Sequence, residues 1–133
     1  MPQDPVVPGG QTRRTIDEVL DEARALLDRL EPRGALDAVE HGALIVDIRP
    51  SEQRERDGEV PGAHVIPRNV LEWRLDPACE HRDDKLARTD GAVIVVCDEG
   101  YQSSLAAATL RRFGIDATDV IGGVQAWREA GLP

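Results

Sequence analysis

The chain has 133 residues, which suits one domain built around a single core. Its formal net charge of −9 disfavours nucleic acid and anionic membrane surfaces as partners, because both attract basic proteins. No apolar run approaches the roughly 18 residues that span a bilayer, and the first residues lack the apolar core of a signal peptide. We therefore expect a cytoplasmic protein.

The N-terminal part of the chain is predicted to form a tail and a helix. Residues 1–14 are rich in Pro and Gly with little to bury, which indicates a flexible tail. From Thr15, a capping box with Glu18 and apolar residues at helical spacing predict an amphipathic helix over residues 15–31. We expect this helix to pack over one edge of the sheet. A dimer or partner surface is the alternative.

A buried strand is predicted next, with two candidate supporting residues at its end. A short helical segment ends at Gly42, and the apolar run 43–48 follows. Asp47 and Arg49 lie near the carboxyl end of this strand, where ligands gather in parallel α/β sheets. We expect Asp47 to bond loop amides and Arg49 to form an ion pair, with direct substrate contact as the alternative.

The middle of the chain is predicted to add short elements. A charged helix over residues 51–57 is expected to present a solvated face, and residues 77–90 form a polar loop. Between them, a short strand around Val65 leads to a helical segment that begins at Arg68. We expect Arg68 to pair with a neighbour such as Glu72, and contact with an anionic substrate group is the alternative.

The stretch Val93–Ser104 carries the candidate catalytic residue. Four apolar residues predict a strand buried on both faces that ends at Cys97, and residues 105–112 have helix-forming composition. Gly100 permits a positive φ in the loop between them, so that successive backbone amides can turn toward one point. The start of the helix adds the positive end of its dipole.

The occupant expected at that point is a Cys97 thiolate. The pKa of a free cysteine is about 8.5, and helix N-termini of this kind lower it to roughly 3.5–7.5. Asp98 and Glu99 would each oppose this by only about half a pKa unit. Together they would weaken the binding of a small dianion by about 10- to 100-fold. A buried cysteine with a purely structural role is the alternative.

The other cysteine, Cys79, has a different sequence context, so we expect two reduced thiols and leave open a role for Cys79 as a resolving thiol. Cys79 and His81 form a lone pair, and nothing else has the spacing of metal ligands. We predict no metal site and no cofactor.

Toward the C-terminus, Gly114 is placed to end the helix, a short strand is expected over residues 118–121, and Gly122 with Gly123 opens a last helix. Strands that alternate with short helices indicate an α/β domain over residues 15–133. We expect a mostly parallel central sheet flanked by helices, with the N-terminal helix as an addition.

Four motifs follow one another along the chain: Val46–Arg49, Gly58–Pro67, the loop Cys97–Ser103, and Ile121–Trp127 followed by Gly131–Pro133. In this order they make the chain resemble the rhodanese-like domains, a family of sulfurtransferases that carry sulfur as a cysteine persulfide. The resemblance covers residues 35–133 and implies a rhodanese-like fold. It implies that Cys97 is the catalytic nucleophile, and that the substrate is bound by Asp98, Glu99, Gly100, Tyr101, Gln102, Ser103 and Arg68.

The loop differs from that of family members that use thiosulfate. Those members often carry Arg or Lys in the loop, and many end it with Arg, whereas this chain has Asp98, Glu99 and Gln102. We expect a sulfurtransferase, monomeric or homodimeric, that receives sulfane sulfur from a small donor or a protein persulfide and for which thiosulfate is a poor donor. A protein partner is a further expectation. The alternatives are a non-catalytic binding or regulatory module, and a phosphatase or arsenate reductase, which the acidic loop disfavours.

Overall fold

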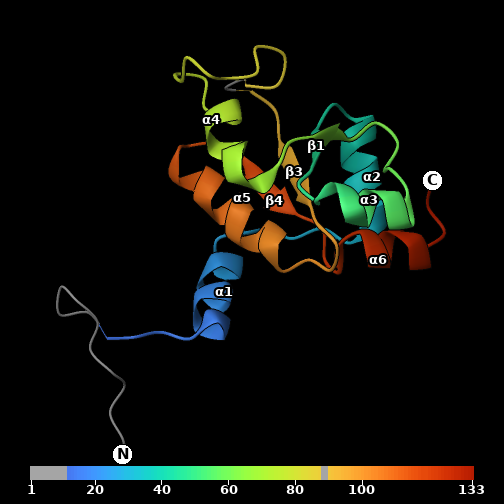
Figure 1. Cartoon of the computed structure of the whole chain (residues 1–133), viewed down its shortest axis with the longest axis horizontal. Helices are drawn as coiled ribbons and strands as arrows, with labels where there is room; N and C mark the ends of the chain where they lie inside the picture. Colours follow the sequence, from blue (N-terminus) through green and yellow to red (C-terminus); the bar gives the residue numbers. More distant parts are fainter. Residues whose placement is uncertain (1–11, 88–89) are drawn as a thin grey trace, which may run out of the picture.

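The computed structural model describes residues 12–87 and 90–133, and most of the predicted N-terminal tail lies outside these residues. A four-stranded parallel sheet in the order β2-β1-β3-β4 forms the centre of the molecule (Figure 1). Its strands are β1 (Leu44–Asp47), β2 (His64–Val65), β3 (Val93–Val96) and β4 (Ala117–Asp119). The helices are α1 (Ile16–Ala25), α2 (Pro32–Glu40), α3 (Ser51–Asp57), α4 (Leu71–Leu75), α5 (Gln102–Arg112) and α6 (Gly123–Glu129), with a 3-10 helix η1 (Arg68–Val70). The predicted α/β class with a parallel sheet is confirmed.

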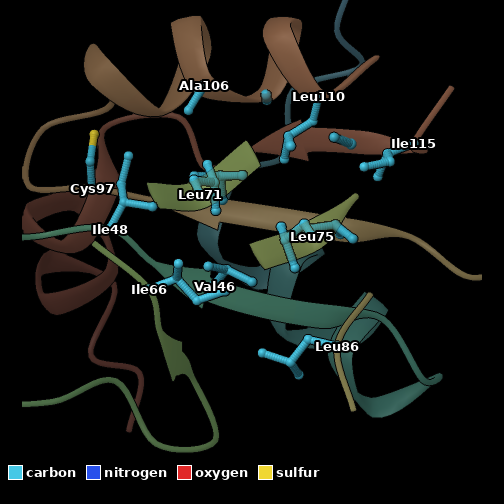
Figure 2. Packing of buried hydrophobic residues seen from close by; sticks show 14 residues of the cluster. Val46, Ile48, Ile66, Leu71, Leu75, Leu86, Cys97, Ala106, Leu110 and Ile115 are labelled. Atoms are coloured by element: carbon cyan, nitrogen blue, oxygen red, sulfur yellow. The ribbon is translucent and has the colours of Figure 1, made fainter. Parts of the chain in front are cut away.

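The side chains of β3 alternate between two cores, one on each face of the sheet. Val95 and Cys97 belong to the core beneath α4 and α5, whereas Ile94 and Val96 belong to the core beneath α2 and α6. Successive side chains of a strand point to opposite faces, so this alternation directs Cys97 toward α5. Figure 2 shows Cys97 at one end of its core, beside Ile48.

Local signals at helix starts are confirmed. The side-chain oxygen of Thr15 accepts from the Glu18 N–H at 3.1 Å, and the Glu18 carboxylate accepts from the Thr15 N–H at 3.2 Å, which is the predicted capping box. Pro32 is the first residue of α2, where its missing N–H costs no hydrogen bond. The charged helix α3 has the predicted bounds.

The prediction that the first helix extends to residue 31 is wrong, because α1 ends at Ala25. Leu27 packs against the core beneath α5, and Leu30 packs against the core on the opposite face of the sheet. The apolar spacing therefore reflects burial in two separate cores, which no single helix face could reach.

The expected position of this helix over a sheet edge is also corrected. α1 packs against α5, and its residues Leu20 and Ala23 are buried. In Figure 1, α1 lies below α5. The extended segment after α1 covers the edge of β4 instead, where Leu30 forms a parallel bridge with Val120.

Among residues 12–87 and 90–133, none of the helices has the length and the apolar composition that a membrane-spanning helix needs.

Candidate active site

Cys97 follows the last residue of β3, at the carboxyl edge of the sheet. Its Sγ accepts hydrogen bonds from the backbone N–H of Gly100 at 3.2 Å and of Ser103 at 3.3 Å. Gly100 has a φ of +88°, and Ser103 is the second residue of α5, so its N–H has no partner within the helix. A loop amide and a helix N-terminus thus converge on the sulfur, which favours negative charge there.

The N-terminus of α6 holds the first two loop carbonyls away from the sulfur. The N–H of Val124 donates to the carbonyl of Cys97 at 2.9 Å, and that of Gln125 donates to the carbonyl of Asp98 at 3.1 Å. Gly123 permits this close approach, because a Cβ at this position would lie 2.5 Å from the Cys97 carbonyl oxygen. Gly123, which was predicted to open the last helix, therefore also allows the start of α6 to bind the carbonyls of Cys97 and Asp98.

A pocket of about 260 Å³ opens at Cys97, although this residue is itself only 6% exposed. The loop supplies one wall, and the segment from the end of β1 into α3 supplies the other. The lining residues are Ile48, Arg49, Pro50, Gln53, Cys97, Asp98, Glu99, Tyr101 and Gln102. The loop residues and Arg49 were expected near the sulfur, whereas Ile48, Pro50 and Gln53 were not.

Asp47 and Arg49 form an ion pair whose two side chains are both fully buried. Nη2 of Arg49 lies 2.8 Å from Oδ2 of Asp47, and the backbone N–H of Arg49 donates to Oδ1 at 3.0 Å. Arg49 also donates to the carbonyl of Gly58 at 2.9 Å. The predicted ion pair is confirmed. Although Arg49 lines the pocket, its charge is offset by Asp47.

Asp98 is tied to two helices rather than standing alone. Its Oδ1 accepts from Arg56 Nη2 at 2.9 Å and from Gln125 Nε2 at 2.9 Å. The same two groups donate to Asp57, and the hydrogen bond from Arg56 is the main reason that the pKa of Asp57 falls from 3.8 to about 2. The expectation that α3 presents only a solvated charged face is therefore wrong.

Glu99 is the exposed carboxylate of the rim. Within residues 12–87 and 90–133 it has no hydrogen-bond or ion-pair partner, and it lines the Cys97 pocket. The only cation among the described lining residues is Arg49, which is held by Asp47. One uncompensated negative charge thus faces an incoming ligand.

The chain matches the family described as the rhodanese-like domain over residues 21–130. It belongs to the rhodanese-like domain family. The maize protein named adenylyltransferase and sulfurtransferase MOCS3-2 is 36% identical over 110 residues, covering 82% of this chain and 22% of the maize protein. The chain thus spans about a fifth of the length of this relative.

Two solved structures extend the comparison. A protein of unknown function from Rhodopseudomonas palustris, described as a possible tyrosine phosphatase, is 33% identical with a TM-score of 0.83, and the match covers 100% of this chain and 98% of that one. The thiosulfate sulfurtransferase from Pseudomonas aeruginosa has a TM-score of 0.65 at 24% identity and covers 80% of this chain and 19% of that one. The second likeness bears on the fold alone.

In this rhodanese-like domain Arg68 lies beside the Cys97 pocket, where it lines an adjacent hollow with Ile48 and Arg49. Its Nη1 donates to Glu72 at 2.8 Å, which confirms the expected pairing, and its Nε donates to the side chain of Gln102 at 3.2 Å. The cation that offsets Asp98 is Arg56.

Sequence reasoning missed a buried network behind the loop. The carboxylate of Asp119 accepts from the hydroxyls of Ser103 at 2.7 Å and Ser104 at 2.8 Å, and it pairs with Arg29 at 2.8 Å. Ser103 therefore turns its hydroxyl away from the pocket and its N–H toward Cys97. A charged residue at a position of β4 that points inward was the available signal.

Cys79 is half-buried and free, and it lines a separate pocket with Trp73 and Phe113. Its role as a resolving thiol stays a prediction. In the described part of the chain, no group of three or more His, Cys, Asp and Glu side chains is placed to hold a metal ion.

Proposed function

We propose that this rhodanese-like domain is a sulfurtransferase that carries sulfane sulfur as a persulfide on Cys97. The observation that supports this most directly is the pair of N–H groups, from Gly100 and Ser103, that donate to Sγ at the base of a pocket. These amides favour the ionised form of the sulfur, which is the nucleophilic form. The maize relative, whose name includes sulfurtransferase, supports the same assignment.

The reaction is a double displacement at one sulfur atom. The Cys97 thiolate attacks the sulfane sulfur of the donor, an S–S bond forms, and the bond from that sulfur to the rest of the donor breaks, with its electron pair leaving on the donor residue. An acceptor nucleophile then attacks the outer sulfur of the persulfide and releases the thiolate. The loop amides stabilise the negative charge in each state, so neither half-reaction needs a general base.

The rim disfavours small dianions such as thiosulfate. Glu99 adds a negative charge at the mouth, and Arg49 is already occupied by Asp47. Repulsion of a dianion by one such carboxylate costs about 1 kcal/mol at a separation of about 8 Å in a water-like medium. A donor with less charge, or a persulfide on another protein, suits the site better, and Tyr101 and Gln102 on its wall would select the donor's shape.

The test is intact mass after incubation with thiosulfate, mercaptopyruvate or a protein persulfide. We expect the mass of one additional sulfur on the parent and on Cys79→Ser, and none on Cys97→Ser. Cyanide should remove the added sulfur as thiocyanate. A folded protein that gains no sulfur from any donor would contradict the proposal and favour the non-catalytic binding module.

A phosphatase is the second candidate, favoured by the description of the R. palustris protein. Against it, neither Arg nor Lys follows Cys97 in the loop through Ser103, although an oxyanion site would need a cation there, and Glu99 would repel phosphate. Turnover of an aryl phosphate that is lost in Cys97→Ser would make the phosphatase the better assignment.

A further inference from the structure

Arg24 in α1 contacts the Cys97 loop from outside the part of the chain that carries the four motifs. Its Nη2 donates to the carbonyl of Gly100 at 2.9 Å and its Nε donates to the hydroxyl of Ser104 at 3.1 Å. Its guanidinium also lies over the ring of Tyr101, 5.5 Å from the centroid. One side chain of the N-terminal helix thus contacts three residues of the loop and the start of α5.

Arg29 reaches the same carbonyl from the extended segment after α1. Its Nη2 donates to the carbonyl of Gly100 at 3.0 Å, while its Nε binds Asp119 at 2.8 Å. Two guanidinium groups therefore converge on a single peptide oxygen. Hydrogen bonds from charged donors are roughly twice as strong as neutral ones, so this carbonyl is held firmly in one direction.

The direction of that carbonyl matters because its peptide is joined at the Gly100 Cα to the peptide whose N–H donates to the sulfur. Gly100 has a φ of +88°, and glycine has more backbone freedom than any other residue. If this carbonyl rotated toward the pocket, the Gly100–Tyr101 peptide would bring a partial negative charge toward Sγ. The two arginines oppose that rotation. α6 acts in the same way on the carbonyls of Cys97 and Asp98.

We propose that Arg24 and Arg29 are positioning residues of the Cys97 loop, which makes the N-terminal segment a part of the sulfur-transfer site. They act by holding the Gly100 carbonyl away from the sulfur, so that its partial negative charge does not oppose the thiolate. The proposal rests on the proposed role of Cys97 as the nucleophile, and it assigns α1 more than a packing role.

The test uses Arg24→Gln in a Cys79→Ser background. Arg29 is unsuitable because its loss would leave the buried Asp119 unpaired. Both acceptors of Arg24 are neutral: the Gly100 carbonyl keeps Arg29 as a donor, and the Ser104 hydroxyl still donates to Asp119. The matched control is Arg33→Gln, since Arg33 is exposed and has no side-chain partner within the described residues. The rate at which iodoacetamide alkylates Cys97 is measured across a pH series.

We expect Arg24→Gln to shift the acid limb of the profile to higher pH, with alkylation about 3- to 10-fold slower at a pH near 6.5 and an unchanged plateau at high pH. Arg33→Gln should follow the parent. An unshifted profile in Arg24→Gln, or equal slowing at every pH, would overturn the proposal, because neither fits a carbonyl dipole that is released toward the thiolate.

Arg24→Lys separates positioning from charge and serves if Arg24→Gln does not fold, as judged by its unfolding transition. Lysine keeps the charge but cannot span Gly100 and Ser104 with a fork, so its profile should also shift, by at least about 2-fold in rate. A parental profile in Arg24→Lys would overturn the proposal. Alkylation requires no sulfur donor, so failure here is distinct from failure of persulfide formation.

Discussion

Two carboxylate clusters flank the Cys97 loop, and they differ in burial more than in chemistry. Behind the loop, Asp119 is fully buried and the Arg29 side chain is 16% exposed. At the rim, Asp98 pairs with Arg56, whose side chain is 55% exposed. Water and salt weaken the rim pair, whereas the rear pair must be satisfied internally. The rear cluster therefore governs loop shape, and the rim governs the charge that a ligand meets.

The largest effect is expected for Asp119→Ala, which would leave Arg29 and two hydroxyls behind the loop without their acceptor. Loss of one partner of a buried pair costs about 3–5 kcal/mol of unfolding free energy. Urea unfolding measures it. Asp98→Asn at the rim should cost about 0–1 kcal/mol by the same method. Equal losses at the two sites would break the distinction between the clusters.

Gly100→Ala tests how tightly the loop is held between the clusters. An added Cβ would lie 2.8 Å from the backbone nitrogen of Gly122, and the φ of +88° is strained for alanine. We expect a loss of about 1–3 kcal/mol in urea unfolding, together with slower alkylation of Cys97. Gly114→Ala is the matched control, because its φ is +81° with no atom within 4 Å. If Gly114→Ala costs as much, backbone strain alone explains the loss and contact with Gly122 contributes nothing.

Glu99→Gln tests whether the charge at the rim weakens the binding of thiosulfate. Removing the one uncompensated carboxylate should lower the KM for thiosulfate by about 3- to 10-fold, with little change for an uncharged donor. Glu40→Gln removes the same charge from an exposed position at the end of α2 and should change neither value beyond the effect of net charge. A KM for thiosulfate that is unaffected by Glu99→Gln would mean that the rim charge does not select the donor.

The smallest effect concerns acid stability. The folded-state pKa of Asp57 is about 2, below the ordinary 3.8, so its contribution is complete above pH 4 and is lost as the pH falls toward 2. Unfolding free energy of Asp57→Asn should therefore depend less steeply on pH within that window than the parent's. The check is urea unfolding at intervals from pH 5 to 2. Parallel curves for the two proteins would contradict the assignment.

The unit from β3 to α5 was predictable because its signals are local. An apolar run, a glycine with a positive φ and a helix-forming stretch follow one another directly, and the sulfur lies where they meet. The end of α1 was predicted wrongly because Leu27 and Leu30 keep helical spacing while entering different cores. Spacing along a sequence cannot show which core receives a side chain.

The contacts that restrain the loop were beyond sequence reasoning for a similar cause. Arg56 and Asp98 are 42 residues apart, Arg24 and Gly100 are 76 apart, and Arg29 and Asp119 are 90 apart. Arginines and carboxylates are numerous in this chain, so many pairings were equally plausible until the fold selected these. Arg24 follows the buried Ala23 and lies four residues beyond the buried Leu20, which was a weak signal of its inward position.

The strict alternation of side chains along β3 limits how the chain length can vary. Inserting or deleting one residue between Val93 and Cys97 would turn the sulfur to the opposite face of the sheet, toward Trp127 and away from the start of α5. The number of residues in the polar connection before β3 does not affect the face of the sheet on which the sulfur lies. Homologues that retain the nucleophile should therefore tolerate length changes in that connection and keep the count within this strand fixed.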